Sequence, residues 1–235
     1  MMLRSDRCRL SKKTPKEIVE MGECPLDPGG YFIIRGTEKV ILIQEQMSKN
    51  RIIVDQDRQG GITASVASTT QERRTKTNVQ YNKAKKVVLK HNSFTSDIPI
   101  CVVIKALGIL SDQEIVEIVC GFDPVLVDLF SPSIQECAKL KIFTQQQALE
   151  YMSTKVKMGL RTFQRGQKRS ALDETKDVLQ NMVVSHIAAD NIKGSTNLRP
   201  KAIYIGIMIR RVLFAVRDGG IIDDRDYVGN KRLEL

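Results

Sequence analysis

Three carboxylates near the end of the sequence are the residues whose type and spacing best suit chemistry. Asp223, Asp224 and Asp226 fall within one run of four residues, 223–226. Carboxylates that converge in a fixed cavity hold the metal ions used in phosphoryl and nucleotidyl transfer. Arg225 lies among these three, however, and short acidic motifs give many false positives. We therefore predict no metal site in this chain.

The histidines and cysteines suggest no second reactive centre. His91 and His186 are far apart and have no nucleophile beside them, so we predict no catalytic residues. None of the five cysteines is in CxxC spacing, which argues against a zinc site made within the chain. An odd, scattered set of cysteines fits a reducing compartment, the cytosol or the nucleus. Cys101, Cys120 and Cys137 lie in apolar stretches and are expected to be buried.

The charge balance favours a polyanionic partner. The chain of 235 residues has a formal net charge of +10 and a pI of about 9.4. Lys and Arg displace counterions from phosphates, so nucleic acid is one candidate, while a solvated basic face or an acidic protein partner is the alternative. Aromatic residues make up only 5%, without Trp, so stacking platforms for single strands are not expected. The candidate residues for contacts with nucleic acid in the strand-rich part of the chain are Arg73, Arg74, Lys76, Lys83, Lys85 and Lys86.

The elements that must position these residues indicate an α+β chain in which strands precede helices. A capping box at Thr14 and Glu17, with Pro15 between them, predicts a short first helix. A hairpin is expected from two apolar runs, residues 31–35 and 39–44, joined through residues 36–38. Further strands are predicted at residues 50–54, 62–70, 75–81 and 86–90. The apolar run 98–104 fits either a strand weakened by Pro99 or the start of a buried helix.

Helical signals dominate after residue 111. Capping boxes are expected at Ser111 with Glu114 and at Thr144 with Gln147, and Ser131 is expected to cap a helix that has Pro132 at its first position. Residues 171–184 and 200–216 are predicted to complete the helical part. The basic stretch 156–170 is predicted to be a mobile loop. The sequence has no segment that is long and apolar enough to span a bilayer.

Two strings at the ends of the chain resemble a known family. Residues 29–45, GGYFIIRGTEKVILIQE, and residues 223–235, DDRDYVGNKRLEL, resemble two signatures of the second-largest subunit of multisubunit RNA polymerases. MLRS at residues 2–5, SDIPI at 96–100 and KALGI at 105–109 also resemble landmarks of that family. Residues 45–54, EQMSKNRIIV, and the second signature look most like RNA polymerase III, with RNA polymerase II as the alternative.

This resemblance implies an architecture. Residues 1–54 would be part of a β-rich protrusion, residues 55–216 a mixed lobe domain, and residues 217–235 a return to the protrusion and fork. The chain would then be an internal piece of a larger subunit, cut from strands with which it should pair. We expect partial folding in isolation on this view. A free-standing basic domain that binds nucleic acid or a protein is the competing hypothesis, and it predicts a cooperative melt and salt-dependent DNA binding.

The resemblance also implies the function and its residues. The family performs nucleotidyl transfer with Mg²⁺ held elsewhere, mainly by the largest subunit, so this piece alone is expected to be inactive and to bind no cofactor. Its partners would be other polymerase subunits, notably the largest, together with template DNA and the RNA–DNA hybrid, in the nucleus and away from membranes. The residues expected to contact nucleic acid are Lys39, Gln44, Lys231 and Arg232. The alternative is that Lys39 pairs with Glu38 or Asp27 and that Gln44 caps a turn.

Overall fold

The computed structural model describes residues 1–57, 60–157, 170–192, 195–219 and 222–234. The chain divides into two compact units, Met1–Met47 with Asp226–Leu235 as unit 1, and Ser48–Arg225 as unit 2. Helices and antiparallel strands occur together, so the predicted α+β class is confirmed. The predicted segments at residues 1–54, 55–216 and 217–235, with their protrusion and lobe assignments, stay predictions.

Unit 1 begins with a short helix and a hairpin. The predicted capping box starts α1 (Pro15–Glu20), because the Glu17 amide donates to Thr14 Oγ1 and the Thr14 amide donates to the Glu17 carboxylate at 2.8 Å. The hairpin joins β1 (Phe32–Ile34) and β2 (Thr37–Lys39). Its turn is only Arg35 and Gly36, both at positive φ, the geometry of the tightest hairpin connections.

That tight turn corrects one prediction. The second strand of the hairpin was predicted at residues 39–44, but pairing resumes directly after Gly36 and ends at Lys39. Residues 40–43 therefore lie outside the hairpin. Unit 1 also contains β3 (Gln44–Met47), the 3-10 helix η2 (Val228–Asn230) and β11 (Lys231–Glu234).

Unit 2 contains a five-stranded antiparallel sheet, in which the chain order is also the spatial order. Its strands are β4 (Ile52–Gln56), β5 (Ile62–Thr69), β6 (Arg74–Tyr81), β7 (Val87–His91) and β8 (Ile98–Pro99). Four of them lie close to the predicted ranges. The ambiguous run 98–104 turns out to be mainly helix, with only its first two residues in the sheet.

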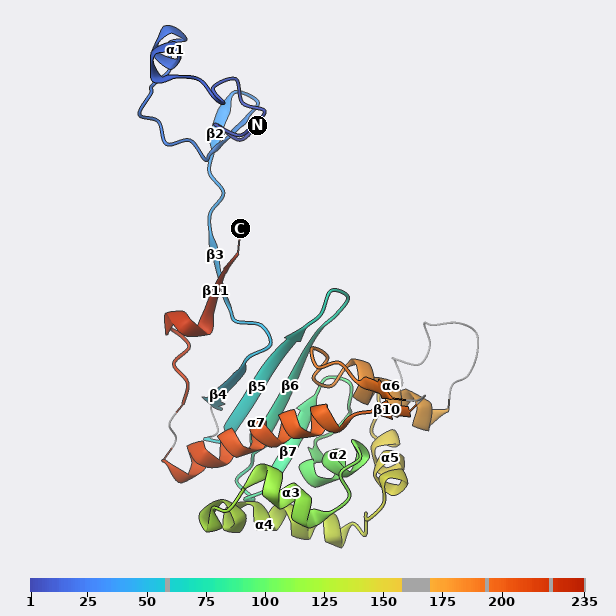
Figure 1. Ribbon diagram of the computed structural model, residues 1–235. Coiled ribbons are helices and arrows are strands. Elements are labelled where there is room, and N and C mark those ends of the chain that lie inside the picture. Colours follow the sequence, from blue (N-terminus) through green and yellow to red (C-terminus); the bar gives the residue numbers. More distant parts are fainter. Residues whose placement is uncertain (58–59, 158–169, 193–194, 220–221, 235) are drawn as a thin grey trace. The chain divides into compact units, whose positions relative to one another are not determined.

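Helices pack on one face of this sheet (Figure 1). They are α2 (Ile100–Ala106), α3 (Asp112–Val119), α4 (Pro124–Lys139), α5 (Gln145–Ser153), α6 (Ala171–Asn181) and α7 (Arg199–Arg217). The hairpin of β9 (Asp190–Ile192) and β10 (Ser195–Asn197) precedes α7. Helix α7 lies across β4, β5 and β6, where its buried side chains meet those of Val54, Ala64 and Val66 in the main core.

The helix starts show which local signals prevailed. Ser111 caps α3 by accepting the Glu114 amide, but the predicted box is only half formed, because the Glu114 carboxylate pairs with Arg199. The predicted capping box of Thr144 and Gln147 starts α5. The predicted start at Ser131 and Pro132 is wrong, because α4 begins eight residues earlier with Asp123 as its cap and Pro124 in its first turn. Pro132 then sits inside the helix, where it removes one backbone hydrogen bond. Burial of Leu126, Phe130 and Cys137 along one face of α4 keeps the helix continuous. Most of the predicted basic loop, residues 158–169, lies outside the described residues.

Candidate nucleic-acid interface

In unit 1, strands β3 and β11 bring residues 44–47 together with residues 231–234. They pair antiparallel, with Lys231 opposite Met47, Arg232 opposite Gln46 and Glu234 opposite Gln44. Residues of the two strings that carry the family resemblance therefore form one two-stranded ribbon. Three of the four residues predicted to contact nucleic acid, Gln44, Lys231 and Arg232, lie on it.

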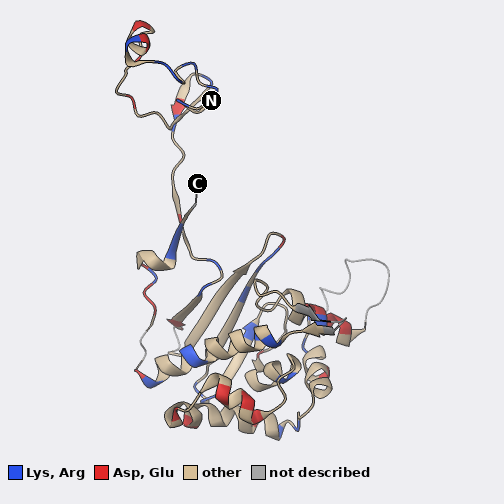
Figure 2. Ribbon diagram, viewed as in Figure 1, with Lys and Arg blue, Asp and Glu red and all other residues tan. Residues whose placement is uncertain are grey.

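The ribbon separates the two basic residues that the sequence places side by side. Opposed residues share a face and neighbours along a strand alternate, so Arg232 lies on the same face as Gln46 and Gln44. Lys231 lies on the other face, and its ammonium is 3.1 Å from the Glu45 carboxylate and 3.8 Å from that of Asp226. Part of the Lys231 charge is thus neutralised within the ribbon. Figure 2 shows the basic residues at the start of β11.

Lys39 lies apart from this ribbon, at the end of β2 opposite Phe32. Its side chain is exposed and makes no ion pair within the described part of the chain. Asp27, its suggested partner, instead accepts hydrogen bonds from the Tyr31 hydroxyl at 2.6 Å and the Gly29 amide at 2.9 Å. These bonds lower the pKa of Asp27, and the bond from Tyr31 raises the pKa of that phenol to about 12. The assignment of all four residues to nucleic acid stays a prediction.

The acidic run at residues 223–226 has a structural use. Asp223 lies along the outer edge of β4, where its carboxylate accepts the Val54 amide at 2.9 Å and its own amide donates to the Val54 carbonyl at 3.0 Å. Arg211 donates to the Ile52 carbonyl at 2.9 Å and lies 3.7 Å from Asp223. Arg225 pairs with Asp55 on the same strand. These side chains cover a sheet edge that would otherwise be free to pair with another chain, and they do not fit a metal site.

No group of three or more His, Cys, Asp or Glu side chains in the described residues could hold a metal ion. His91 is mostly buried, and burial lowers its pKa to about 4. Burial also raises the pKa of the Cys120 thiol to about 11, so this thiol stays protonated at neutral pH. None of the helices described here is long and apolar enough to cross a membrane.

The basic residues of unit 2 do not form one cluster. Arg73, Arg74 and Lys76 lie at the end of the sheet where β5 and β6 turn, whereas Lys83, Lys85 and Lys86 lie at the opposite end, between β6 and β7. Lys86 is also paired with Glu136 at 2.8 Å. Figure 2 shows Lys and Arg spread over several elements. A single DNA-facing patch built from these six residues is therefore excluded by the topology.

The sheet face turned away from the helices carries a polar basin that the sequence analysis did not predict. Its lining includes Thr63 and Ser65 of β5, Lys76, Asn78 and Gln80 of β6, and Lys90 of β7, around a volume of about 580 Å³. Alternate residues of β6 from Arg74 to Gln80 are all polar, and this period of two was the available signal. Strand order alone could not show that the polar face stays free of helices.

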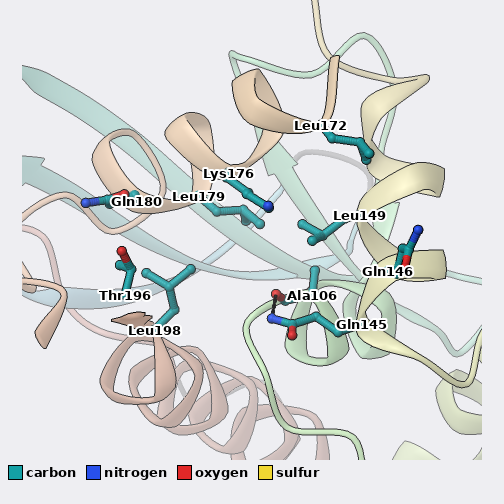
Figure 3. A pocket seen from close by; sticks show the side chains of 10 residues that line it. All are labelled: Ala106, Gln145, Gln146, Leu149, Leu172, Lys176, Leu179, Gln180, Thr196 and Leu198. Atoms are coloured by element: carbon teal, nitrogen blue, oxygen red, sulfur yellow. Dashed lines mark hydrogen bonds between the residues drawn. The ribbon is translucent and has the colours of Figure 1, made fainter. Parts of the chain in front are cut away.

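A second hollow, of about 600 Å³, lies between α2, α5, α6 and the start of α7 (Figure 3). Leu149, Leu172, Leu179 and Leu198 give it an apolar lining, and Gln145 donates from its edge to the Ala106 carbonyl at 3.0 Å. Lys176 is the one charged residue among the ten that line it. This lining supplies no acid–base pair for catalysis.

Comparison with known proteins adds a family to this geometry. Residues 48–234 match the family model described as RNA polymerase Rpb2, domain 2. The whole chain is 55% identical over 237 residues to DNA-directed RNA polymerase III subunit RPC2 of Schizosaccharomyces pombe, and 50% identical over 236 residues to that of Saccharomyces cerevisiae. DNA-directed RNA polymerase II subunit 2 of Arabidopsis thaliana is 32% identical over 252 residues. The chain spans 20% of the length of each of these relatives.

Proposed function

This chain belongs to the family described as RNA polymerase Rpb2, domain 2, and on that premise we propose that it helps to form the wall of the DNA cleft in RNA polymerase III. The single observation that carries the proposal is the level of identity, 55% and 50% to the two yeast class III subunits against 32% to the class II subunit. Its role is architectural and electrostatic. Nucleotide addition belongs to the assembled enzyme, with Mg²⁺ held outside this chain.

The partners in this proposal are the other polymerase subunits, above all the largest, and the template with its RNA–DNA hybrid, in the nucleus. Within unit 1, Arg232 and Gln44 are the preferred contacts with nucleic acid because they share one face of the β3–β11 ribbon. Arginine and glutamine both donate hydrogen bonds to phosphate oxygens. Lys231 lies on the other face, where Glu45 and Asp226 offset its charge. Lys39 is exposed and has no ion-pair partner among the described residues, so it is a further candidate for contact with nucleic acid.

Affinity purification of the polypeptide that carries this chain tests the assignment. RNA polymerase III subunits should co-purify from nuclear extract, and the purified assembly should incorporate nucleotides, whereas the isolated chain should not. Recovery of the polypeptide without any polymerase subunit would instead favour a free-standing basic module.

The residue assignment has a separate test in the assembled enzyme. Arg232→Ala should make a preformed elongation complex dissociate at lower salt, and the slope of log affinity against log salt should fall by about one. Lys16→Ala is the matched control, because Lys16 is an exposed cation on α1. Equal salt profiles for Arg232→Ala and the unmodified enzyme would rule out this contact.

A further inference from the structure

The basin on the open face of the sheet has the form of a shallow trough along β5. The side chains of β5 that point away from the helices, those of Thr63, Ser65 and Ala67, are small, so the surface over β5 is lower than over the neighbouring strands. The trough is bordered on one side by Asp55 of β4 and on the other by Lys76, Asn78 and Gln80 of β6. Successive outward residues on one strand are about 6.8 Å apart, which is also the repeat of an extended peptide.

Two amide side chains in the trough have a polar atom without a hydrogen-bond partner among the described residues. Gln80 is only 7% exposed and makes no side-chain hydrogen bond within the described residues. Asn78 Oδ1 is buried and likewise has no partner there. Gly61 leaves space for the Gln80 amide, because a Cβ at Gly61 would lie 2.9 Å from Gln80 Nε2. A buried amide oxygen without a hydrogen-bond donor is uncommon in folded proteins, so Asn78 Oδ1 indicates a ligand that can donate, while the Gln80 amide beside it can both donate and accept.

The charges of the trough define that ligand further. Lys76 is exposed and has no ion-pair partner among the residues described. Arg225 is paired with Asp55, and Lys90 is 3.5 Å from Asp97, so those cations are already offset. Lys76 is therefore the cation available to an incoming carboxylate.

We propose that this trough binds an extended acidic peptide segment of another protein, with main-chain amides bonded to Asn78 and Gln80 and a carboxylate paired with Lys76. A peptide N–H supplies the donor that Asn78 Oδ1 needs, and phosphate groups supply none. The lining residues include no aromatic side chain on which a base could stack. The peptide is thus favoured over nucleic acid, and the proposal stands whether or not the chain works in a polymerase.

Fluorescence anisotropy with the full chain tests the proposal. The probe is a short fluorescein-labelled peptide of alternating Glu and Thr, compared with its Gln-for-Glu counterpart and with labelled duplex DNA. Lys76→Glu should weaken binding of the acidic peptide at least about tenfold, since a hydrogen bond to a charged group contributes about 1.5 kcal/mol or more. Lys83→Glu, the same change at an exposed site beyond the other end of β6, should alter it less than about twofold.

Other results would overturn the proposal. They are the absence of binding by the acidic peptide, equal losses in Lys76→Glu and Lys83→Glu, and a loss in Lys76→Glu that affects duplex DNA more than the peptide. Circular dichroism of both variants verifies folding, and Lys76→Gln replaces Lys76→Glu if the charge reversal unfolds the chain. A further readout is the pair of side-chain amide NMR signals of Asn78 and Gln80, which should shift with the acidic peptide and stay unchanged with DNA.

Discussion

Acid should destabilise unit 2 through His91. This side chain is mostly buried at the end of β7, where its Nδ1 accepts a hydrogen bond from the Ser93 amide at 3.1 Å. Its ring packs edge-on against the ring of Phe94, with 6.1 Å between the ring centroids. Protonation would place an N–H of the ring against the N–H of Ser93. Burial accordingly lowers the pKa of His91 from its ordinary 6.5 to about 4.

The size of the effect follows from linkage. Between pH 6.5 and 4 the unfolded chain binds a proton that the folded chain refuses, so stability falls as the pH falls through this window. The difference of 2.5 between the two pKa values (6.5 minus 4) corresponds to about 3.4 kcal/mol, of which about 3 kcal/mol is lost by pH 4. Total stabilities of about 5–15 kcal/mol make such a loss large.

Urea unfolding at pH 7, 5.5 and 4, followed by circular dichroism, measures this loss. His91→Asn is the matched variant, because its side-chain oxygen can accept the Ser93 amide without titrating. Carboxylates titrate in both proteins, so the difference between the two profiles isolates the imidazole. The variant should lose about 3 kcal/mol less than the unmodified chain over this range. Parallel profiles would show that His91 is not buried as a neutral ring.

Three substitutions test other parts of unit 2 by urea unfolding at pH 7. Asp223→Ala should lower the free energy of unfolding by about 1–3 kcal/mol, because the Val54 amide at the sheet edge loses its acceptor. A change near zero would mean that Asp223 does not cover this edge. Ser133→Ala should also lower the free energy of unfolding by about 1–3 kcal/mol, because the buried Val87 amide, which donates to the Ser133 hydroxyl at 3.0 Å, would lose its acceptor. An unchanged urea midpoint would contradict that hydrogen bond. Lys201→Met should cost about 2 kcal/mol, since three carbonyl oxygens 2.6–3.2 Å away lose a charged donor while the burial of an ammonium is relieved. A more stable Lys201→Met protein would show that the cost of burying the charge dominates.

Local chemistry explains why much of the fold was predictable. The capping boxes at Thr14 and Thr144 involve residues three positions apart, and both helix starts appear as predicted. The strands near residues 75–81 and 86–90 were recognised because apolar and polar residues alternate there, and the strand near residues 62–70 because it is rich in Thr, Ser, Val and Ala. Pro132 misled the prediction because its local preference for a helix start was outweighed by the apolar face of α4, which continues from Leu126 to Cys137.

The candidate sites depended more on distant contacts. The sequence placed Lys231 and Arg232 together as cations, but strand geometry turns them to opposite faces. It placed six basic residues of unit 2 in one group, and the sheet separates them to its two ends. The trough along β5 was missed because its small residues signal only a strand. Its identity as a site depends on which face the helices leave open.

By itself, the sequence determined the α+β class, most helix starts and the family resemblance, because these depend on neighbouring residues and on strings that can be read directly. Only the tertiary structure decided that β3 pairs with β11, which brings Glu45 next to Lys231 from a distant part of the sequence. It also decided that Asp223 covers the edge of β4. Such contacts form between groups far apart in the chain, and their stability comes from hydrogen bonds and burial that exist only once the whole fold is in place.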